Sequence, residues 1–208
     1  MSFSAGLTDV YKEFDWLATY GPFHDVSYVS FARSLTPREA LTRLGAGPGD
    51  IEQVTFDGLQ ERTMECIDAD HLRGGYVGAL ETAGWTVLVQ LWTPPARCNR
   101  LLPALSHGTE VVSIERNLHA DDHFTYATDG EQITRFNHLS PHARMGSDPD
   151  RLLVEMREVG LDPDHDRQGP GIHASFQRSF ALAKQLTGFA FSRSMLDSRF
   201  LAIVIRNE

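Results

Sequence analysis

The spacing of apolar residues near the start of the chain predicts a helix, a strand and a second helix. Residues 7–20 carry apolar side chains at helical spacing, whereas residues 24–33 alternate and are rich in Val, Tyr and Phe, as is typical of a strand. The run 36–39 (TPRE) has the capping-box pattern of a helix start, with Thr at the cap, Pro first and Glu third. Gly45 is placed to end that helix in a left-handed conformation.

The middle of the chain predicts an antiparallel meander, because short β-type runs follow one another with turn residues between them. Asp129-Gly130 is the strongest hairpin signal, and Gly84 has the same role in an earlier turn. Strands joined by short connections usually pair with their neighbours in sequence. We therefore expect five strands to pair in order, at residues 76–81, 85–91, 110–116, 123–128 and 132–137.

Helical patterns account for much of the remaining chain. Four more helices are expected, at residues 59–66, 99–107, 148–159 and 173–186. Residues 67–75 are expected to form a loop, and the polar, Gly- and Pro-rich residues 162–171 a flexible loop. The β-branched run 199–206 predicts one further strand, at the edge of the sheet.

Together these elements predict an α+β fold. We expect an antiparallel β-meander of about five to six strands, with helices packed mainly on one face. A length of 208 residues suits a single domain that spans residues 1–208. The share of hydrophobic residues, 41%, and of charged residues, 23%, is that of a globular protein.

The charge balance excludes one large class of partner. The chain has 19 Lys and Arg residues against 28 Asp and Glu residues, a formal net charge of −9. Nucleic-acid binding needs a basic surface that neutralises phosphates, so we expect no nucleic acid as a partner. The chain also contains no long apolar run and no signal-peptide pattern, which predicts a cytoplasmic protein without membrane association.

No motif of a common cofactor or hydrolase site occurs in the sequence. It contains no Walker loop, no G-x-G-x-x-G after a strand, no H-E-x-x-H and no G-x-S-x-G. Its two cysteines, Cys66 and Cys98, are too few and too far apart for a disulfide framework or a structural zinc site. We therefore expect no cofactor and no metal ion.

Most of the surplus negative charge is concentrated in one segment. Seven acidic residues between positions 50 and 70 face a single basic one, Arg62, a local balance of −6: Asp50, Glu52, Asp57, Glu61, Glu65, Asp68 and Asp70. An ordinary solvated face is one interpretation of this pattern. The other is a docking surface for a basic protein partner.

Caps, turns and core positions spread over residues 11–200 carry a family resemblance. They are Trp16-Leu17, Leu35-Thr36-Pro37, Arg43-Leu44-Gly45, Gly84-Trp85-Thr86-Val87, Leu105-Ser106, Gly108-Thr109, Asn117, Phe124, Asp129-Gly130, Arg144, Gly146, Asp148-Pro149, Met156-Arg157 and Gly160-Leu161. On these residues the chain resembles an actinobacterial family known as domain of unknown function 6461. None of the motifs is a catalytic signature, so the resemblance implies a fold and no reaction.

The segment 119–123 (HADDH) is the densest group of acid–base side chains in the sequence. His119, Asp122 and His123 are chemically able to share protons near pH 7 or to hold a divalent metal. If the segment is instead a turn between two strands, the two imidazoles point in unrelated directions. A polar hairpin loop and a metal or proton-transfer site are therefore both open.

Arg144 lies in residues 140–148, which are expected to form a loop punctuated by Gly and Pro before the start of the helix at residues 148–159. A helix start can bind an anion, with Arg144 as a second anchor. However, Asp148 already holds the capping position and would repel an anion. The alternative is that Arg144 pairs with a local carboxylate.

Two functions remain open, and the residues alone do not decide whether the protein is an enzyme. The first is a non-catalytic binding module whose acidic face docks on a basic partner, for example as an immunity-type inhibitor of a basic toxin. The second is a cofactor-independent enzyme of a biosynthetic pathway, such as a cyclase, isomerase or hydrolase, that acts on a small molecule. In that case the expected catalytic residues are His119, Asp122, His123 and Arg144.

Overall fold

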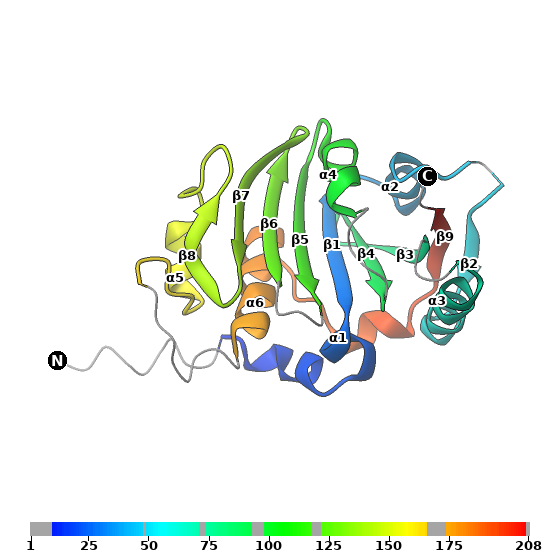
Figure 1. Ribbon diagram of the computed structural model, residues 1–208, viewed down its shortest axis with the longest axis horizontal. Coiled ribbons are helices and arrows are strands. Elements are labelled where there is room, and N and C mark those ends of the chain that lie inside the picture. Colours follow the sequence, from blue (N-terminus) through cyan, green and yellow to red (C-terminus); the bar gives the residue numbers. More distant parts are fainter. Residues whose placement is uncertain are drawn as a thin grey trace.

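The protein is built on one antiparallel sheet of nine strands, in the order β2-β9-β3-β4-β1-β5-β6-β7-β8 (Figure 1). The structure is a computed structural model, and it describes residues 10–47, 49–70, 74–92, 98–117, 122–165 and 174–206. The strands are β1 (Ser27–Arg33), β2 (Glu52–Val54), β3 (Gly74–Thr82), β4 (Trp85–Leu91), β5 (Glu110–Arg116), β6 (His123–Thr128), β7 (Glu131–Asn137), β8 (Ser140–Met145) and β9 (Phe200–Arg206).

Helices cover both faces of this sheet. They are the 3-10 helices η1 (Lys12–Ala18) and η3 (Arg193–Asp197), and the α-helices α1 (Gly21–Asp25), α2 (Pro37–Arg43), α3 (Phe56–Asp70), α4 (Cys98–Ser106), α5 (Leu153–Glu158) and α6 (Ser175–Thr187). In the described part of the chain, no helix combines the length and the apolar character that a membrane span requires.

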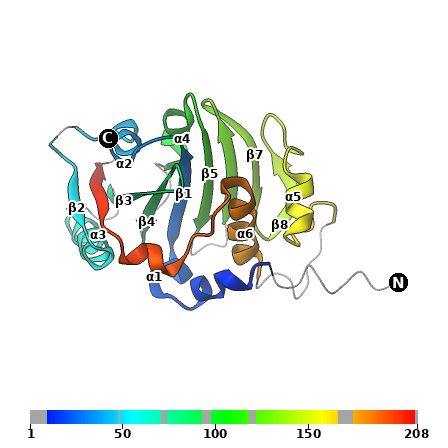
Figure 2. The same ribbon diagram turned by 180° about the vertical axis from the view of Figure 1, so that it is seen from behind.

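Two hydrophobic cores lie on opposite faces of the sheet, because side chains alternate along each strand. The larger core packs the sheet against η1, α1, α3, α5, α6 and η3, and α6 lies in front of the sheet in Figure 2. The smaller core packs the other face against α2 and α4. In Figure 1, α4 crosses the upper ends of β1 and β5 on that face. Most of the helices therefore share one face, although both faces are covered.

The predicted strands and hairpins are present, but the sheet is larger than a meander of five to six strands. Ala83 and Gly84 both have positive φ values in the β3–β4 turn, as Asp129 and Gly130 do in the β6–β7 turn. The expected pairing in order is wrong at one point, because β1 lies between β4 and β5. Burial on both faces explains its central position, since every residue of β1 before Arg33 is buried.

Two strand predictions need correction. The strand β9 lies between β2 and β3 and not at the edge. Its apolar residues serve both cores, with Phe200 in the larger and Ile203 in the smaller, which is a requirement of an interior position. The strand β8 falls in a segment expected to be a loop, because it contains Pro141. An edge strand tolerates proline, which lacks a backbone N–H to donate.

The predicted helices are largely present, but their bounds differ from those expected. Thr36 and Glu39 form the predicted capping box of α2, and Gly45 has a φ of 101°. Helix α3 has 15 residues and replaces both the short helix at 59–66 and the first part of the loop at 67–75, whose last two residues belong to β3. Residues 12–18 form a 3-10 helix, and Gly21-Pro22 begins a new helix rather than ending one, because proline is compatible with a first helical turn.

Gly146 provides a test of how β8 ends. Its φ is +132°, and a Cβ atom there would lie 2.1 Å from the backbone oxygen of Ile133. We expect Gly146→Ala to lower the free energy of unfolding by about 3 kcal/mol or more, measured by urea denaturation. Gly49 is the matched control because a Cβ there meets nothing within 4 Å, so Gly49→Ala should change stability by less than about 0.5 kcal/mol. Equal effects of the two variants would contradict the close approach of Gly146 to the backbone of Ile133.

Candidate functional site

A row of polar side chains crosses five neighbouring strands on the face that carries the smaller core. The residues face one another directly in the strand register, and from β4 to β7 they are Gln90, Tyr28, Glu115, His123 and Asn137. Directly opposed residues in an antiparallel pair lie on the same face of the sheet and contact each other. We call these five residues the polar row.

A second line of polar residues runs beside the polar row. Ser30, Ser113, Thr125 and Arg135 lie opposite one another on β1, β5, β6 and β7. The hydroxyl groups of Ser30 and Ser113 are 3.0 Å apart and form a buried hydrogen bond. The polar surface therefore takes up two successive positions on this face of each of these four strands.

The strands divide their faces sharply between apolar and polar side chains. On β5, Val112 and Ile114 enter the larger core, whereas the residues between and after them, Ser113 and Glu115, face the other way. Nearer to α2 and α4 the same face becomes apolar, with Ala32 and Val111 in the smaller core. The polar row thus occupies the ends of the strands that lie away from α4, at the bottom of the sheet in Figure 1.

Burial changes along the polar row. Gln90, Tyr28 and Glu115 are only 4%, 6% and 5% exposed, whereas His123 and Asn137 are half-buried. A carboxylate is rarely so buried without compensating interactions. The row therefore leads from a half-open end on β6 and β7 to a buried acidic residue on β5.

Two further polar residues gather at the buried acid. The side-chain amide of Asn117 donates a hydrogen bond to Oε1 of Glu115 over 3.4 Å, and its backbone N–H donates to Oδ1 of Asp122 over 2.7 Å. Asp122 directly precedes His123. Glu115, Asp122 and His123 are thus brought together where β5 ends and β6 begins.

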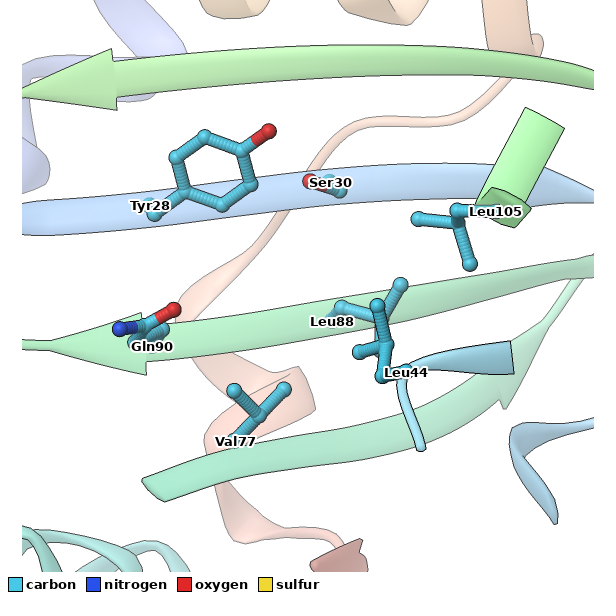
Figure 3. Close-up of a pocket in the computed structure, with 7 residues that line it drawn as sticks. All are labelled: Tyr28, Ser30, Leu44, Val77, Leu88, Gln90 and Leu105. Atoms are coloured by element: carbon cyan, nitrogen blue, oxygen red, sulfur yellow. The ribbon is translucent and has the colours of Figure 1, made fainter. Parts of the chain in front are cut away.

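A small cavity continues the polar surface toward the helices. Figure 3 shows its lining, with Tyr28 and Ser30 on β1, Gln90 on β4, and an apolar wall of Leu44, Val77, Leu88 and Leu105. Its volume is about 10 Å³, which is about the space that one water molecule needs. The buried end of the polar row therefore meets apolar side chains that belong to the smaller core.

His138 supports this site from the opposite face of the sheet. Its Nε2 atom lies 3.0 Å from the backbone oxygen of Glu115, and its backbone N–H donates to the backbone oxygen of Asp122. Its Nδ1 atom lies 2.7 Å from the hydroxyl of Ser179 on α6. Burial lowers the pKa of His138 to about 3, so the ring is neutral, with Nε2 donating and Nδ1 accepting.

The pair of Ser179 and His138 has the hydrogen bond of a nucleophilic dyad but not its accessibility. Ser179 is fully buried and His138 is 1% exposed, among the rings of Phe136 and Phe176. A substrate therefore cannot reach the hydroxyl. The pair is a structural brace between α6 and the strand ends that carry Glu115 and Asp122.

The structure unites only part of the predicted catalytic group. Asp122 and His123 lie beside Glu115, whereas His119 lies outside the described residues. Arg144 is on β8, where it pairs with Asp150 at 2.7 Å and donates to the backbone oxygen of Pro163. These partners place it on the face of the larger core, away from His123. The described residues include no cluster of three or more His, Cys, Asp or Glu side chains suited to a metal ion.

The predicted acidic residues lie mainly on one helix. Four of them are exposed on α3 at helical spacing, and we call them the acidic surface: Asp57, Glu61, Glu65 and Asp68. Asp70 ends the same helix, and its side chain lies outside the described part of the structure. Asp50 instead accepts a hydrogen bond from the backbone of Gly47 within a turn.

Arg62 neutralises part of this charge. Its guanidinium contacts Glu65 at 3.0 Å and Glu52 on β2 at 3.3 Å. Glu52 also accepts a hydrogen bond from the hydroxyl of Tyr76, whose pKa is raised well above its usual value by burial and by that carboxylate. Glu52 therefore contributes to the packing of β2 and α3 as well as to the surface charge.

Sequence reasoning missed four of the five residues in the polar row, Gln90, Tyr28, Glu115 and Asn137, which it assigned only to strands. The available signal is an interruption of apolar strand patterns. Gln90 is the last polar residue of β4 (WTVLVQL), and Ser113 and Glu115 alternate with Val112 and Ile114. Which of these residues meet across the sheet depends on strand order, which the sequence did not predict.

The buried His138 predicts how stability depends on pH. Its pKa is about 3 in the folded protein and about 6.5 in the unfolded chain, so the unfolded chain takes up the proton first as the pH falls. We expect this group to leave stability unchanged above about pH 6.5. Below that value it should cost about 1.4 kcal/mol for each pH unit, down to about pH 3. Urea denaturation between pH 4 and pH 8 measures the slope.

His138→Gln removes this titration while keeping an amide that can donate to the oxygen of Glu115. It should lower stability at neutral pH and flatten the dependence below pH 6.5. His24→Gln is the control, because His24 is exposed and should leave the slope unchanged. An identical slope in His138→Gln would show that another group causes the acid sensitivity.

Comparison with curated proteins and with solved structures finds no match to this chain. A family model, described as a family of unknown function (DUF6461), matches residues 8–207. The match covers every strand and helix described above, and it confirms the family expected from the caps, turns and core positions. The chain therefore belongs to the family of unknown function DUF6461.

Proposed function

We propose that the protein binds a small polar molecule along the polar row and can transfer protons to or from it. The observation that carries the proposal is Glu115, a carboxylate that is 5% exposed and lies in register between Tyr28 and His123. Polar residues on a sheet face reduce the apolar area that packing can bury. Their alignment across five strands favours a recognition role over a purely structural one.

The polar row offers suitable groups for acid–base chemistry. A carboxylate can accept a proton, and a histidine side chain can donate or accept one near neutral pH. The amides of Gln90 and Asn137 can orient a ligand through hydrogen bonds. Such a set fits an isomerase or hydrolase that needs no cofactor, with His123 and Glu115 as the residues that exchange protons.

Substitution of Glu115 tests the proposal. We expect the wild-type protein to bind one or more members of a metabolite panel, detected by native mass spectrometry and confirmed by a rise in melting temperature. Glu115→Gln should weaken that binding at least tenfold, because it removes the charge while keeping the shape. Glu110→Gln is the matched control: it is on the same strand, but Glu110 contacts Arg33 and Tyr126 away from the row.

Two results would count against the proposal. One is a ligand whose affinity is the same for the wild-type protein and for Glu115→Gln. The other is a wild-type protein that binds no member of the panel, while Glu115→Gln unfolds at the same urea concentration as the wild type.

A second candidate function, docking on a basic protein, is supported by the acidic surface. Its four carboxylates lie along the exposed side of α3, while Leu59 and Thr63 on the same helix are fully buried. Met64 lies beside Glu61 and Asp68 and is 47% exposed, which adds an apolar contact to the charged surface. A cationic partner, such as a basic toxin neutralised by an immunity-type inhibitor, would meet complementary charge there.

Charge removal on α3 tests the docking function. We expect Glu61→Gln combined with Asp68→Asn to weaken binding of a basic host protein about tenfold, which is about 1.4 kcal/mol. The interaction should also weaken as the salt concentration rises. Glu81→Gln combined with Glu131→Gln removes two exposed carboxylates elsewhere and should leave affinity unchanged. A partner retained equally by both double variants does not use the acidic surface.

A further inference from the structure

We infer that the cavity between the sheet and helices α2 and α4 binds one water molecule, which links the side chains of Ser30 and Gln90. The inference concerns the buried end of the polar surface and does not depend on the function proposed for the polar row. It follows from the polar groups that form the floor of the cavity, from its size, and from the apolar side chains that close it.

Three polar side chains form the floor of the cavity. Tyr28 and Ser30 lie two residues apart on β1, and Gln90 lies directly opposite Tyr28 on β4. All three residues are buried. Buried polar groups are stable when they are hydrogen-bonded, so this floor favours an occupant that can make hydrogen bonds.

Each of these side chains can make more than one hydrogen bond. A side-chain amide has donor positions on its nitrogen and acceptor positions on its oxygen, and a hydroxyl group both donates and accepts. The hydroxyl groups of Ser30 and Ser113 are 3.0 Å apart, which uses only part of the capacity of Ser30. Bonds that Gln90 and Tyr28 make elsewhere likewise leave them able to bind a water molecule.

The orientation of Gln90 suits a bound water. Figure 3 shows the oxygen of its amide on the side of the other lining residues and its nitrogen on the far side. A water molecule in the cavity can donate one hydrogen bond to this oxygen and accept another from the hydroxyl group of Ser30. Tyr28 provides a further hydroxyl group at the same floor.

The walls determine how much the cavity can hold. They are apolar and come from both the sheet and the helices: Leu44, Val77, Leu88 and Leu105. A volume of about 10 Å³ is close to the smallest that admits one water molecule, so a larger ligand is excluded. A cavity with apolar groups on all sides stays dry, whereas this one has the polar partners that a buried water needs.

The water would connect three strands at the point where the polar surface meets the smaller core. It would join Gln90 on β4 to Ser30 on β1, and through Ser30 to Ser113 on β5. Buried waters of this kind satisfy polar groups that protein atoms alone leave short of partners. The hydration site would thus stabilise β1 at the centre of the sheet.

Two measurements on the full-length protein test for the water. A crystal structure that resolves ordered solvent should contain one water molecule within hydrogen-bond distance of both Ser30 and Gln90. In solution, the methyl protons of Val77 and Leu88 should show nuclear Overhauser effects to a long-lived water. The methyl protons of Val111 are the control, because this residue lies in the smaller core but does not line the cavity.

Either measurement can overturn the inference. A crystal structure that resolves solvent elsewhere but shows none in the cavity would do so. So would the absence of the effect at both Val77 and Leu88.

A variant tests what the water contributes. Val77→Ile adds one methyl group, about the size of a water molecule, at the wall of the cavity. We expect it to displace the water, to remove the effect at Leu88, and to lower the folding equilibrium constant several-fold, because Ser30 and Gln90 lose a partner. Val111→Ile adds a methyl group elsewhere in the smaller core and should keep the effect at Leu88. Filling an empty apolar space would instead stabilise the protein, so a higher urea midpoint for Val77→Ile would overturn the inference.

Discussion

The pairing of β1 with both β4 and β5 is the interaction on which the rest of the structure depends. It joins the part of the sheet that contains β2, β9, β3 and β4 to the part that contains β5, β6, β7 and β8. Val29 and Phe31 anchor the helices of the larger core, while Tyr28 and Ser30 supply the middle of the polar surface. Without this strand, Gln90 and Glu115 would not belong to one site.

The polar row is a local exception to an otherwise apolar arrangement. Both faces of the sheet are covered by helices, and such a sheet gains most stability when both faces are apolar. Here one face changes from Ala32 and Val111 to Ser30 and Ser113 within two residues. Buried polar groups are tolerated when they are hydrogen-bonded, and departures of this kind concentrate at functional sites. The brace of His138 and Ser179 holds the backbone of this region from the other side.

The position of Glu115 illustrates how a fold can provide chemistry without a sequence motif. The carboxylate, the imidazole of His123 and the phenol of Tyr28 come from three different strands and meet only through the strand register. The positions of these three residues in the sequence do not suggest a site. Only the adjacent pair of Asp122 and His123 does so. Arg144 shows the reverse case. It was predicted to act with His123, and its strand β8 follows closely after β6 in the sequence, but it lies on the opposite face of the sheet.

The sequence by itself determined the local features of this protein. The capping box at Thr36, the hairpin at Asp129-Gly130 and the family were all predictable, because turn conformations and helix caps depend on residues a few positions apart. Only the tertiary structure decided the order of the strands, the interior position of β9 and the assembly of the polar row. Those features depend on which strands pair across long stretches of chain, and pairing is set by the burial of both sheet faces at once rather than by any local pattern.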